Sequence, residues 1–278
     1  MIDPKDIEEW LEKIEEEDRE KAKDAARAKG PRHEPTYRVL YADDDIVALE
    51  KDSGIAVIPE RNPELPSVQQ IAQVEFGRLM TIHRIDKETS GVVLFARNEE
   101  AHAELNRQFR ERETEKRYLV IVEGEMPEPT ITVDIPLSTD STRAGRVRPS
   151  ADGKEAITLL TQLERFRGYT LVMARPITGR QHQIRVHCKA VGLPLLVDPA
   201  YGQRDTFLLS TIKKRFRDYG KEEKPLIDRL TLHAASLTIT HPTSGERMTF
   251  TSEPPKDFRA VLTQLRKLRK VQDDPATT

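Results

Sequence analysis

The chain has 278 residues, of which 37% are hydrophobic and 33% charged, a balance typical of a soluble globular protein with one large domain or two modest ones. Its single cysteine, Cys188, excludes an intramolecular disulfide, as expected in a reducing cytoplasm. The sequence shows no apolar N-terminal segment and no run of about 20 apolar residues, so we expect no signal peptide and no membrane span.

The formal net charge of −2 gives little support for a nucleic-acid partner by itself. The charges are unevenly placed, because residues 1–30 hold 11 acidic and 7 basic side chains. The remaining residues hold 36 acidic and 38 basic side chains, a net charge of +2. An RNA site needs a local basic patch, so the charge balance alone does not predict one.

Residues 1–30 are predicted to form a charged helical extension. Ile7, Trp10, Leu11 and Ile14 follow helical spacing and make one short apolar stripe, which ends well before Gly30. We expect this helix to dock by its stripe or to fray, and a dedicated partner-binding arm is the alternative.

Residues 35–270 are predicted to form the main domain, followed by a disordered tail at 271–278. Short β-like runs bounded by turn residues occur at 37–41, 46–50, 55–58, 92–96, 117–122, 157–163, 169–174, 237–240 and 248–251. Helical patterns lie at 68–76, 99–112, 181–191 and 258–270, with Asn98 as an N-cap and Gly192 just past a helix end. Strands outnumber helices without alternating regularly with them. We therefore expect an α+β fold with a central, largely antiparallel or mixed sheet flanked by helices and loops.

Three basic segments stand out in this domain. Residues 204–224 form an insertion with seven basic and four acidic side chains, predicted to be a surface loop or short helix. A group within 143–154 is predicted either to contact phosphates or to be ordinary solvated charge, and it comprises Arg143, Arg146, Arg148 and Lys154. Basic residues at 266–270 are expected on the solvated face of the last helix.

The segment most indicative of chemistry is HRIDKETSG at 83–91, which runs directly into a predicted buried strand. Asp86 has His83 and Arg84 on one side and hydroxyl side chains on the other, and cationic neighbours favour a charged, nucleophilic carboxylate. A turn with local side-chain caps explains this stretch equally well when it is considered alone.

The stretch resembles the signature of the RluA-type pseudouridine synthases, roughly His-Arg-Leu-Asp-x-x-Thr-Ser-Gly. Three further resemblances follow in the order of that family, namely KRYL at 116–119, TGRQHQIRVH at 178–187, and GLPLLVDPAYG at 192–202 with LHA at 232–234. The resemblance extends from about Tyr37 to Phe250. It implies the pseudouridine synthase fold and an enzyme that isomerises chosen uridines in structured RNA, ribosomal or transfer RNA, without cofactor or metal.

The resemblance also implies roles for particular residues. Asp86 is expected to be the nucleophile, Arg185 to pair with it, and Tyr118 to lie against the target base and help to remove the proton from carbon 5. Ile184 is expected to pack around that base, and Arg84 to enter the RNA stack where the uridine has flipped out. The same motifs place further candidate substrate-binding residues at His83, Thr89 and Arg180.

The chain departs from the family pattern in two places, of which the first is a loop detail that leaves the chemistry untouched and the second bears on targeting. Lys51-Asp52-Ser53-Gly54 has aspartate where the family usually has proline, and residues 1–30 do not resemble the small RNA-binding module of many relatives. We therefore expect substrate selection to reside in the catalytic domain, acting as a monomer.

Three rival readings are open to test. A metal site is disfavoured because His182 and His187 are five residues apart and His83, His102, His233 and His241 are isolated in sequence. A Ser–His–Asp hydrolase built from Ser90, His83 and Asp86 lacks a nucleophile-elbow pattern. The third is a catalytically inactive RNA-binding or ribosome-assembly protein that keeps the fold. Cys188 is expected in the core.

Overall fold

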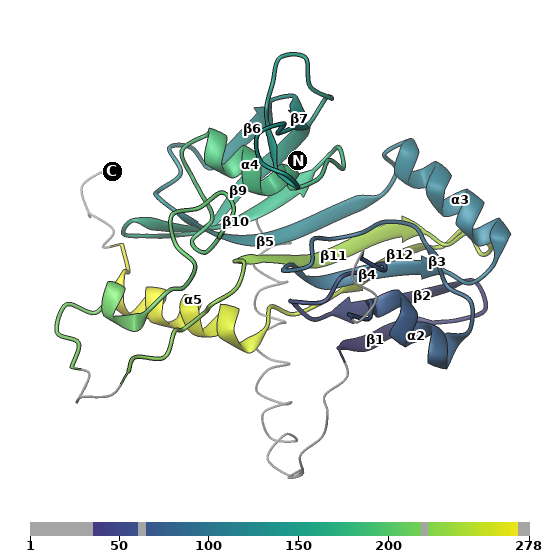
Figure 1. Ribbon diagram of the computed structural model, residues 1–278, viewed down its shortest axis with the longest axis horizontal. Coiled ribbons are helices and arrows are strands. Elements are labelled where there is room, and N and C mark those ends of the chain that lie inside the picture. Colours follow the sequence, from purple (N-terminus) through teal and green to yellow (C-terminus); the bar gives the residue numbers. More distant parts are fainter. Residues whose placement is uncertain (1–35, 61–64, 218–221, 272–278) are drawn as a thin grey trace, which may run out of the picture. The chain divides into compact units, whose positions relative to one another are not determined.

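The computed structural model describes residues 36–60, 65–217 and 222–271 (Figure 1). The predictions for residues 1–30 and for residues 272–278 of the tail fall outside these ranges. Thr36–Thr278 forms one unit by its own contacts.

One large sheet organises the domain. Its main path runs in the order β1 (Tyr37–Ala42), β2 (Ile46–Lys51), β4 (Ser90–Ala96), β11 (Leu232–Thr240), β5 (Glu115–Glu123), β10 (Tyr169–Pro176), β9 (Ile157–Phe166) and β6 (Thr130–Asp134). Strand β12 (Arg247–Thr251) pairs with β11, and β3 (Met80–Thr81) pairs with β4. A separate hairpin joins β7 (Leu137–Thr139) to β8 (Val147–Pro149). Among the strands of the described residues, only β4 and β11 pair in parallel, so the α+β fold with a mixed, largely antiparallel sheet is confirmed.

The inner strands β2 and β4 of the first half of the sheet are buried on both faces. Alternate residues of β4 point to opposite sides: Val93 and Phe95 pack under helix α2 (Val68–Phe76), whereas Val92 and Leu94 pack under helix α3 (Glu99–Arg110). All seven residues of β4 are therefore buried, although the strand belongs to a largely antiparallel sheet. The HRIDKETSG motif leads into this buried central strand.

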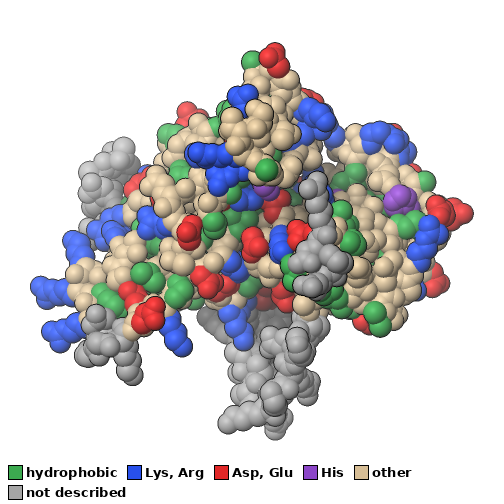
Figure 2. All heavy atoms as spheres, viewed as in Figure 1, with side chains coloured by type: hydrophobic (Ala, Val, Ile, Leu, Met, Phe, Trp, Pro, Cys, Tyr) green, Lys and Arg blue, Asp and Glu red, His purple; other side chains and the backbone are tan. Residues whose placement is uncertain are grey.

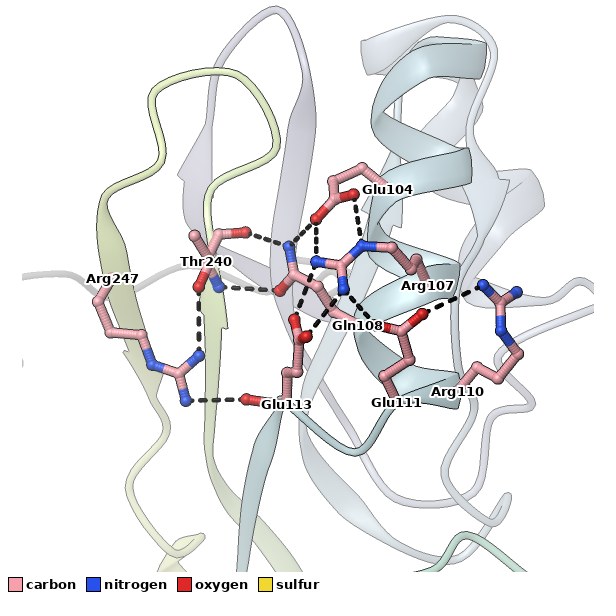
Figure 3. Close-up of polar contacts among 8 residues, drawn as sticks. All are labelled: Glu104, Arg107, Gln108, Arg110, Glu111, Glu113, Thr240 and Arg247. Carbon is pink, nitrogen blue, oxygen red and sulfur yellow. Dashed lines mark hydrogen bonds and ion pairs between the residues drawn. The ribbon is translucent and has the colours of Figure 1, made fainter.

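Helix α3 is fixed to the far end of β11 by its own polar side chains (Figure 3). The buried Gln108 amide donates to the Thr240 carbonyl oxygen at 2.7 Å and accepts from the Thr240 amide at 2.9 Å. On the solvent side, Arg107 forms ion pairs with three carboxylates, those of Glu104, Glu111 and Glu113. Because Phe109 and Arg110 of the same helix face a cavity, these contacts set the position of one cavity wall.

The second half of the sheet packs against helix α4 (Gln183–Ala190). Ile184 and Cys188 of α4 join Val120, Val172 and Leu160 in one core cluster, which confirms that Cys188 is a core residue. Helix α5 (Lys256–Leu268) buries a stripe of its own, formed by Phe258, Val261, Leu262 and Leu265. In Figure 1, α4 and α5 lie in the left half of the view, whereas α2 and α3 lie on the right.

Most predicted elements are present, and one is wrong. Residues 55–58 do not form a strand, because the carbonyls of Ala56 and Val57 accept the amides of Val68 and Gln69 at the start of α2. Their apolar side chains nevertheless enter the core beneath α2. The predicted helices 99–112, 181–191 and 258–270 begin or end within two residues of α3, α4 and α5. Strands β3, β6, β7 and β8 were not predicted.

Asn98 is the N-cap of α3, with its side chain accepting from the Ala101 amide, and Gly192 follows α4 with φ 78°, both as predicted. Within the described ranges, no helix has the length and apolar character to cross a membrane.

Candidate active site

The HRIDKETSG motif forms a tight loop between β3 and β4. Its turn is closed by the Thr89 amide, which donates to the Asp86 carbonyl oxygen at 3.0 Å. The fully buried ammonium of Lys51 donates to the Lys87 carbonyl oxygen at 2.9 Å, and also to those of Asp52 and Ile55 at 2.7 Å each. Burial lowers the pKa of Lys51 to about 7, although three carbonyl acceptors suit the charged form with its three N–H groups. The sequence analysis did not identify this support.

The side chain of Asp86 turns toward α4 and does not cap its own loop. Its Oδ2 accepts from Arg185 Nη1 at 3.0 Å, across 99 residues of sequence. Arg185 is only 8% exposed, and its other two nitrogens form a bidentate pair with Asp198, Nε to Oδ2 at 2.8 Å and Nη2 to Oδ1 at 2.7 Å. Asp198 also accepts the backbone amides of Ala200 and Tyr201. Burial alone would raise the pKa of Asp198, but the bonds from Arg185 and from the two amides lower it. Arg185 is therefore held rigidly by one carboxylate while it orients another.

A cavity of about 620 Å³ opens in front of Asp86. This volume lies within the range of roughly 300–1,000 Å³ usual for small-molecule sites. All eight residues proposed from the sequence line it: Asp86, Tyr118, Arg185, Arg84, His83, Ile184, Thr89 and Arg180. The structure thus brings together segments that are up to about 100 residues apart in sequence.

Tyr118 and Ile184 give the cavity its apolar wall. Tyr118 comes from β5 and packs against the core clusters on both sides, and its hydroxyl has no hydrogen-bond partner among the described residues. Burial, with a smaller contribution from the Asp86 charge, raises the pKa of Tyr118 above its usual value, so the phenol is neutral near pH 7. Ile184 is 6% exposed and faces the same space.

Thr89 places a second polar group without a partner in the cavity. Its side chain is 1% exposed, and Oγ1 has no hydrogen-bond partner in the described part of the chain. A buried hydroxyl without a partner costs stability, commonly about 1–3 kcal/mol. Such groups at a site are often satisfied by a ligand or by water.

His83 connects the HRIDKETSG loop to strand β4. Its Nε2 accepts the amide of Leu94 in β4 at 3.1 Å, and its ring stacks on Phe109 with centroids 5.1 Å apart. Burial lowers the pKa of His83 to about 3, with a smaller contribution from Lys116. The ring is therefore neutral with its proton on Nδ1, which leaves it no free lone pair for proton abstraction.

Basic side chains surround the cavity mouth. Arg84 is exposed and has no ion-pair partner among the described residues, whereas Arg180 donates to the Glu155 carbonyl oxygen at 2.8 Å. Arg112, with a left-handed φ of 61°, pairs with the Glu155 carboxylate. Figure 2 shows further Lys and Arg side chains around the β7–β8 hairpin and near the 3-10 turn Leu209–Thr211, which lies in the predicted basic insertion.

The hydrolase reading is wrong, because Ser90 does not contact His83. Ser90 is 1% exposed, and its Oγ bonds to Nδ1 of the fully buried His233 at 3.0 Å. His233 Nε2 in turn donates to the Ser252 carbonyl oxygen at 2.9 Å. Neither Ser90 nor His233 lines the cavity. These two residues form a structural bond across the β4–β11 junction.

His241 is not isolated in space. Its Nε2 donates to Asp43 Oδ2 at 2.9 Å, and Asp45 lies near enough for these three residues to offer metal-ligand geometry. Asp43 already accepts the amides of Asp45 and Ile46 and the hydroxyl of Tyr41. These contacts link the β1–β2 turn to the end of β11. None of the three residues lines the cavity.

The sequence analysis did not identify four residues that shape the site: Lys51, His182, Asp198 and Tyr201. Three of them lie inside quoted motifs, His182 in TGRQHQIRVH and the other two in GLPLLVDPAYG. Asp198 could have been recognised as a partner of Arg185, because a buried arginine needs more than one acceptor and Asp198 is the acidic residue of GLPLLVDPAYG. Lys51 gave a different signal, a lysine at the end of a strand that begins with four apolar residues.

Comparison with known proteins connects this arrangement to one family. The family model described as RNA pseudouridylate synthase matches residues 45–190, which include Asp86, Tyr118 and Arg185. The chain is 37% identical over 231 residues to the dual-specificity RNA pseudouridine synthase RluA of Escherichia coli (strain K12), covering 82% of this chain and 97% of that protein. It is 36% identical over 238 residues to an uncharacterized RNA pseudouridine synthase of Aquifex aeolicus, covering 82% of this chain and 72% of that protein.

Two solved human structures are similar in fold. RNA pseudouridylate synthase domain containing 4 aligns with a TM-score of 0.64 at 25% identity, covering 82% of this chain and 92% of that one. RNA pseudouridylate synthase domain containing 1 aligns with a TM-score of 0.63 at 26% identity, covering 82% and 87%.

Proposed function

The chain belongs to the RNA pseudouridylate synthase family, with relatives of the RluA type, and we propose that it converts chosen uridines in ribosomal or transfer RNA with Asp86 as the nucleophile. The observation that supports this role is the position of the Asp86 carboxylate. It is paired with a buried arginine and exposed to a cavity whose wall is aromatic and apolar.

The reaction is balanced without a co-reactant. The bond between uracil N1 and ribose C1′ breaks, the base turns, C5 bonds to C1′, and the proton that leaves C5 is matched by one gained at N1. We therefore propose that no cofactor and no metal takes part. Asp86 attacks either the ribose or the uracil ring, and the geometry of this site is compatible with both.

The two carboxylate oxygens of Asp86 have different surroundings, which supports different roles for them in the reaction. Oδ2 accepts from Arg185, whereas Oδ1 has no hydrogen-bond donor among the described residues. A carboxylate oxygen that keeps its lone pairs free is the better nucleophile. We assign Oδ1 to the attack and Oδ2 to anchoring.

The other lining residues support binding of a flipped base. Tyr118 and Ile184 offer a surface against which uracil can stack and pack, and the Thr89 hydroxyl, which is buried beside the cavity and has no partner among the described residues, can bond to the base once its side chain turns. A base must leave its helix to reach this depth, at a cost of a few kcal/mol. Arg84, exposed two residues before the nucleophile, is placed to enter the space that the base leaves.

His83 and Arg180 have supporting roles in this proposal. His83 holds the loop through Leu94 and keeps Nδ1–H for a polar atom of the substrate. Arg180 and the arginines of the β7–β8 hairpin provide positive charge along the path of the RNA backbone. We further propose that the enzyme acts as a monomer in the cytoplasm.

The names of the relatives support RNA as the substrate, and one of them supports ribosomal RNA. One is called dual-specificity and another is a ribosomal large subunit pseudouridine synthase from Escherichia coli, 34% identical over 235 residues. Neither name identifies the uridine that this chain modifies.

The test is pseudouridine mapping of total RNA from cells with and without the gene, complemented by wild type or by Asp86→Asn. Sites that vanish with the gene and return only with wild type support both the activity and the role of Asp86. Asp86→Asn keeps the size and one hydrogen-bond acceptor, so RNA binding should persist while isomerisation stops. Restoration of the sites by Asp86→Asn would refute the nucleophile, and identical maps in all cells would favour an inactive RNA-binding protein.

A further inference from the structure

His182 lies in the same cavity as Asp86, and none of the steps above uses it. It is the residue directly before α4, and its backbone is left-handed, with φ 52° and ψ 19°. This conformation is uncommon for residues other than glycine and persists where the surroundings enforce it. The enforced conformation directs the imidazole back toward the catalytic loop, where its Nε2 lies 3.8 Å from Asp86 Oδ2.

Tyr201 determines which nitrogen of His182 holds the proton. The Tyr201 hydroxyl accepts the amide of Val147 at 2.8 Å and lies 2.8 Å from His182 Nδ1. Among the described residues, Nδ1 is the only acceptor in hydrogen-bond range of this hydroxyl hydrogen. The hydroxyl therefore donates to Nδ1, and the remaining proton of a neutral ring is on Nε2. That N–H faces the carboxylate of Asp86.

The charged groups around His182 keep this single proton in place. Burial is the largest influence on its pKa and lowers it, while Asp86 and Asp198 raise it and Arg185 and Arg84 lower it. The net direction is downward, so the ring is neutral near pH 7. The ring of Tyr201 also contacts both of these side chains, since it lies edge-on to His182 and under the Arg185 guanidinium.

We propose that His182 is a positioning residue for the nucleophile: its Nε2–H, set by Tyr201, is a second donor beside the anchored oxygen Oδ2 of Asp86. Arg185 and His182 then both donate to Oδ2, from two directions. This fixes the rotation of the carboxylate and points Oδ1 at the substrate. The 3.8 Å separation closes to a hydrogen bond by a small rotation of Asp86 when the RNA fills the cavity. The inference rests on the proposed reaction of Asp86.

The activity test compares two amides at position 182. Asparagine adopts left-handed backbone readily and retains an amide near Tyr201, but it is too short to reach Asp86. Glutamine extends its amide nitrogen to about the place of Nε2. Purified His182→Asn and His182→Gln are compared with wild type for kcat, KM and melting temperature on an RNA that the wild type modifies. Wild-type turnover in the same assay establishes the reaction independently of His182.

The expected result is a fall in kcat for His182→Asn of at least about tenfold, as for loss of an orienting donor, with KM and melting temperature unchanged. His182→Gln should recover a substantial part of that loss. Full kcat in His182→Asn would overturn the proposal. So would a rise in KM alone, because this would make His182 an RNA contact and not a positioning residue.

A second measurement does not depend on activity. The ¹⁵N spectrum of the imidazole should show the Nε2–H form for His182 in wild type, and a mixture of the two neutral forms in Tyr201→Phe. An Nδ1–H form in wild type would refute the tautomer on which the donor depends, whatever the enzyme does with RNA.

Discussion

Arg185 connects two carboxylates of unequal burial. Asp86 is about one-quarter exposed at its side chain, whereas the Asp198 side chain is 1% exposed and takes two of the three bonds. Asp198 can therefore be regarded as the structural partner and Asp86 as the functional one. Tyr201 links the same group to the β7–β8 hairpin through Val147.

Arg185→Leu is expected to destabilise the protein by about 3–5 kcal/mol, because it leaves Asp198 buried and unpaired. Thermal or urea unfolding measures this difference. Adding Asp198→Asn should restore stability in part, since asparagine keeps the Oδ1 acceptor for the Ala200 and Tyr201 amides without the charge. The double variant should remain inactive. An unchanged melting temperature in Arg185→Leu would contradict the buried pair.

The residues that sequence could predict are those whose chemistry is visible in one motif. Asp86, Tyr118 and Arg185 each stand at a motif position, and all three line the cavity. Lys51 and His182 make contacts that exist only in the folded chain. Lys51 bonds to three backbone carbonyls, and His182 bonds to the hydroxyl of Tyr201. Such contacts leave no periodic signal.

At the scale of elements, the β4–β11 pair is the junction on which the site depends. Gly91 and Ala234 face each other in parallel register directly after the catalytic loop. A Cβ at Gly91 would lie 2.1 Å from the Ala234 carbonyl oxygen, and its φ of +114° strains any other residue. Only glycine allows the two strands to approach this closely.

Gly91→Ala is therefore expected to lower the free energy of unfolding by about 3 kcal/mol or more, from steric overlap and backbone strain together. Gly245→Ala is the matched control, since Gly245 also has positive φ (+73°) but open space around the new methyl group. The control should cost only about 1 kcal/mol. Urea unfolding of both variants makes the comparison, and equal losses would show that the close approach is unimportant.

Sequence patterns predicted elements where one periodicity dominated and failed where tertiary contacts decided. The β4 segment and α2 gave clear signals and were predicted closely. Residues 55–58 have the apolar character of a strand, yet their carbonyls bind the first amides of α2. Strands β7 and β8 are three residues each, too short for a period of two to be recognised.

At the scale of the whole molecule, two histidines buried in neutral form determine part of the response to pH. Burial lowers the pKa of His233 to about 4 and that of His83 to about 3, from about 6.5 in the unfolded chain. The unfolded state therefore binds more protons than the native state between these values, so stability falls as the pH drops from about 6.5 to about 4.

The predicted loss from His233 alone is about 3 kcal/mol over that interval. Urea unfolding at a series of pH values measures the slope. His233→Gln, which keeps polar groups near Ser90 and Ser252, should flatten the slope even if it lowers stability at pH 7. A slope identical to that of wild type would show that His233 does not control this transition.

RNA binding by the whole molecule should depend on the arginines of the β7–β8 hairpin, of which Arg143 and Arg148 are exposed. Within the described ranges, no salt bridge neutralises Arg143, Arg146 or Arg148. Replacing all three by glutamine should reduce the slope of log affinity against log salt by about 2, since each phosphate contact contributes about 0.7–0.9. A triple change of exposed lysines on α5 and just after its end is the control and should leave the slope unchanged, with substitutions at Lys256, Lys267 and Lys270. Equal slopes for both triple variants would identify the hairpin arginines as ordinary solvated charge.

The position of β11 in the sheet has a consequence for biosynthesis. Strand β11 lies between β4 and β5, and Ser90 meets His233 across 143 residues of sequence. A nascent chain can pair β1 with β2 and β4, and β5 with β10 and β9, as soon as these segments leave the ribosome. The two parts acquire their common strand only after residues 232–240 have been made. Asp86 lies in the first part, and Arg185 follows the strands of the second. The proposed nucleophile therefore meets its partner late in synthesis, and long-range pairing of this kind is slow. Until then the growing chain holds two half-sites, neither of which can act on the RNA around it.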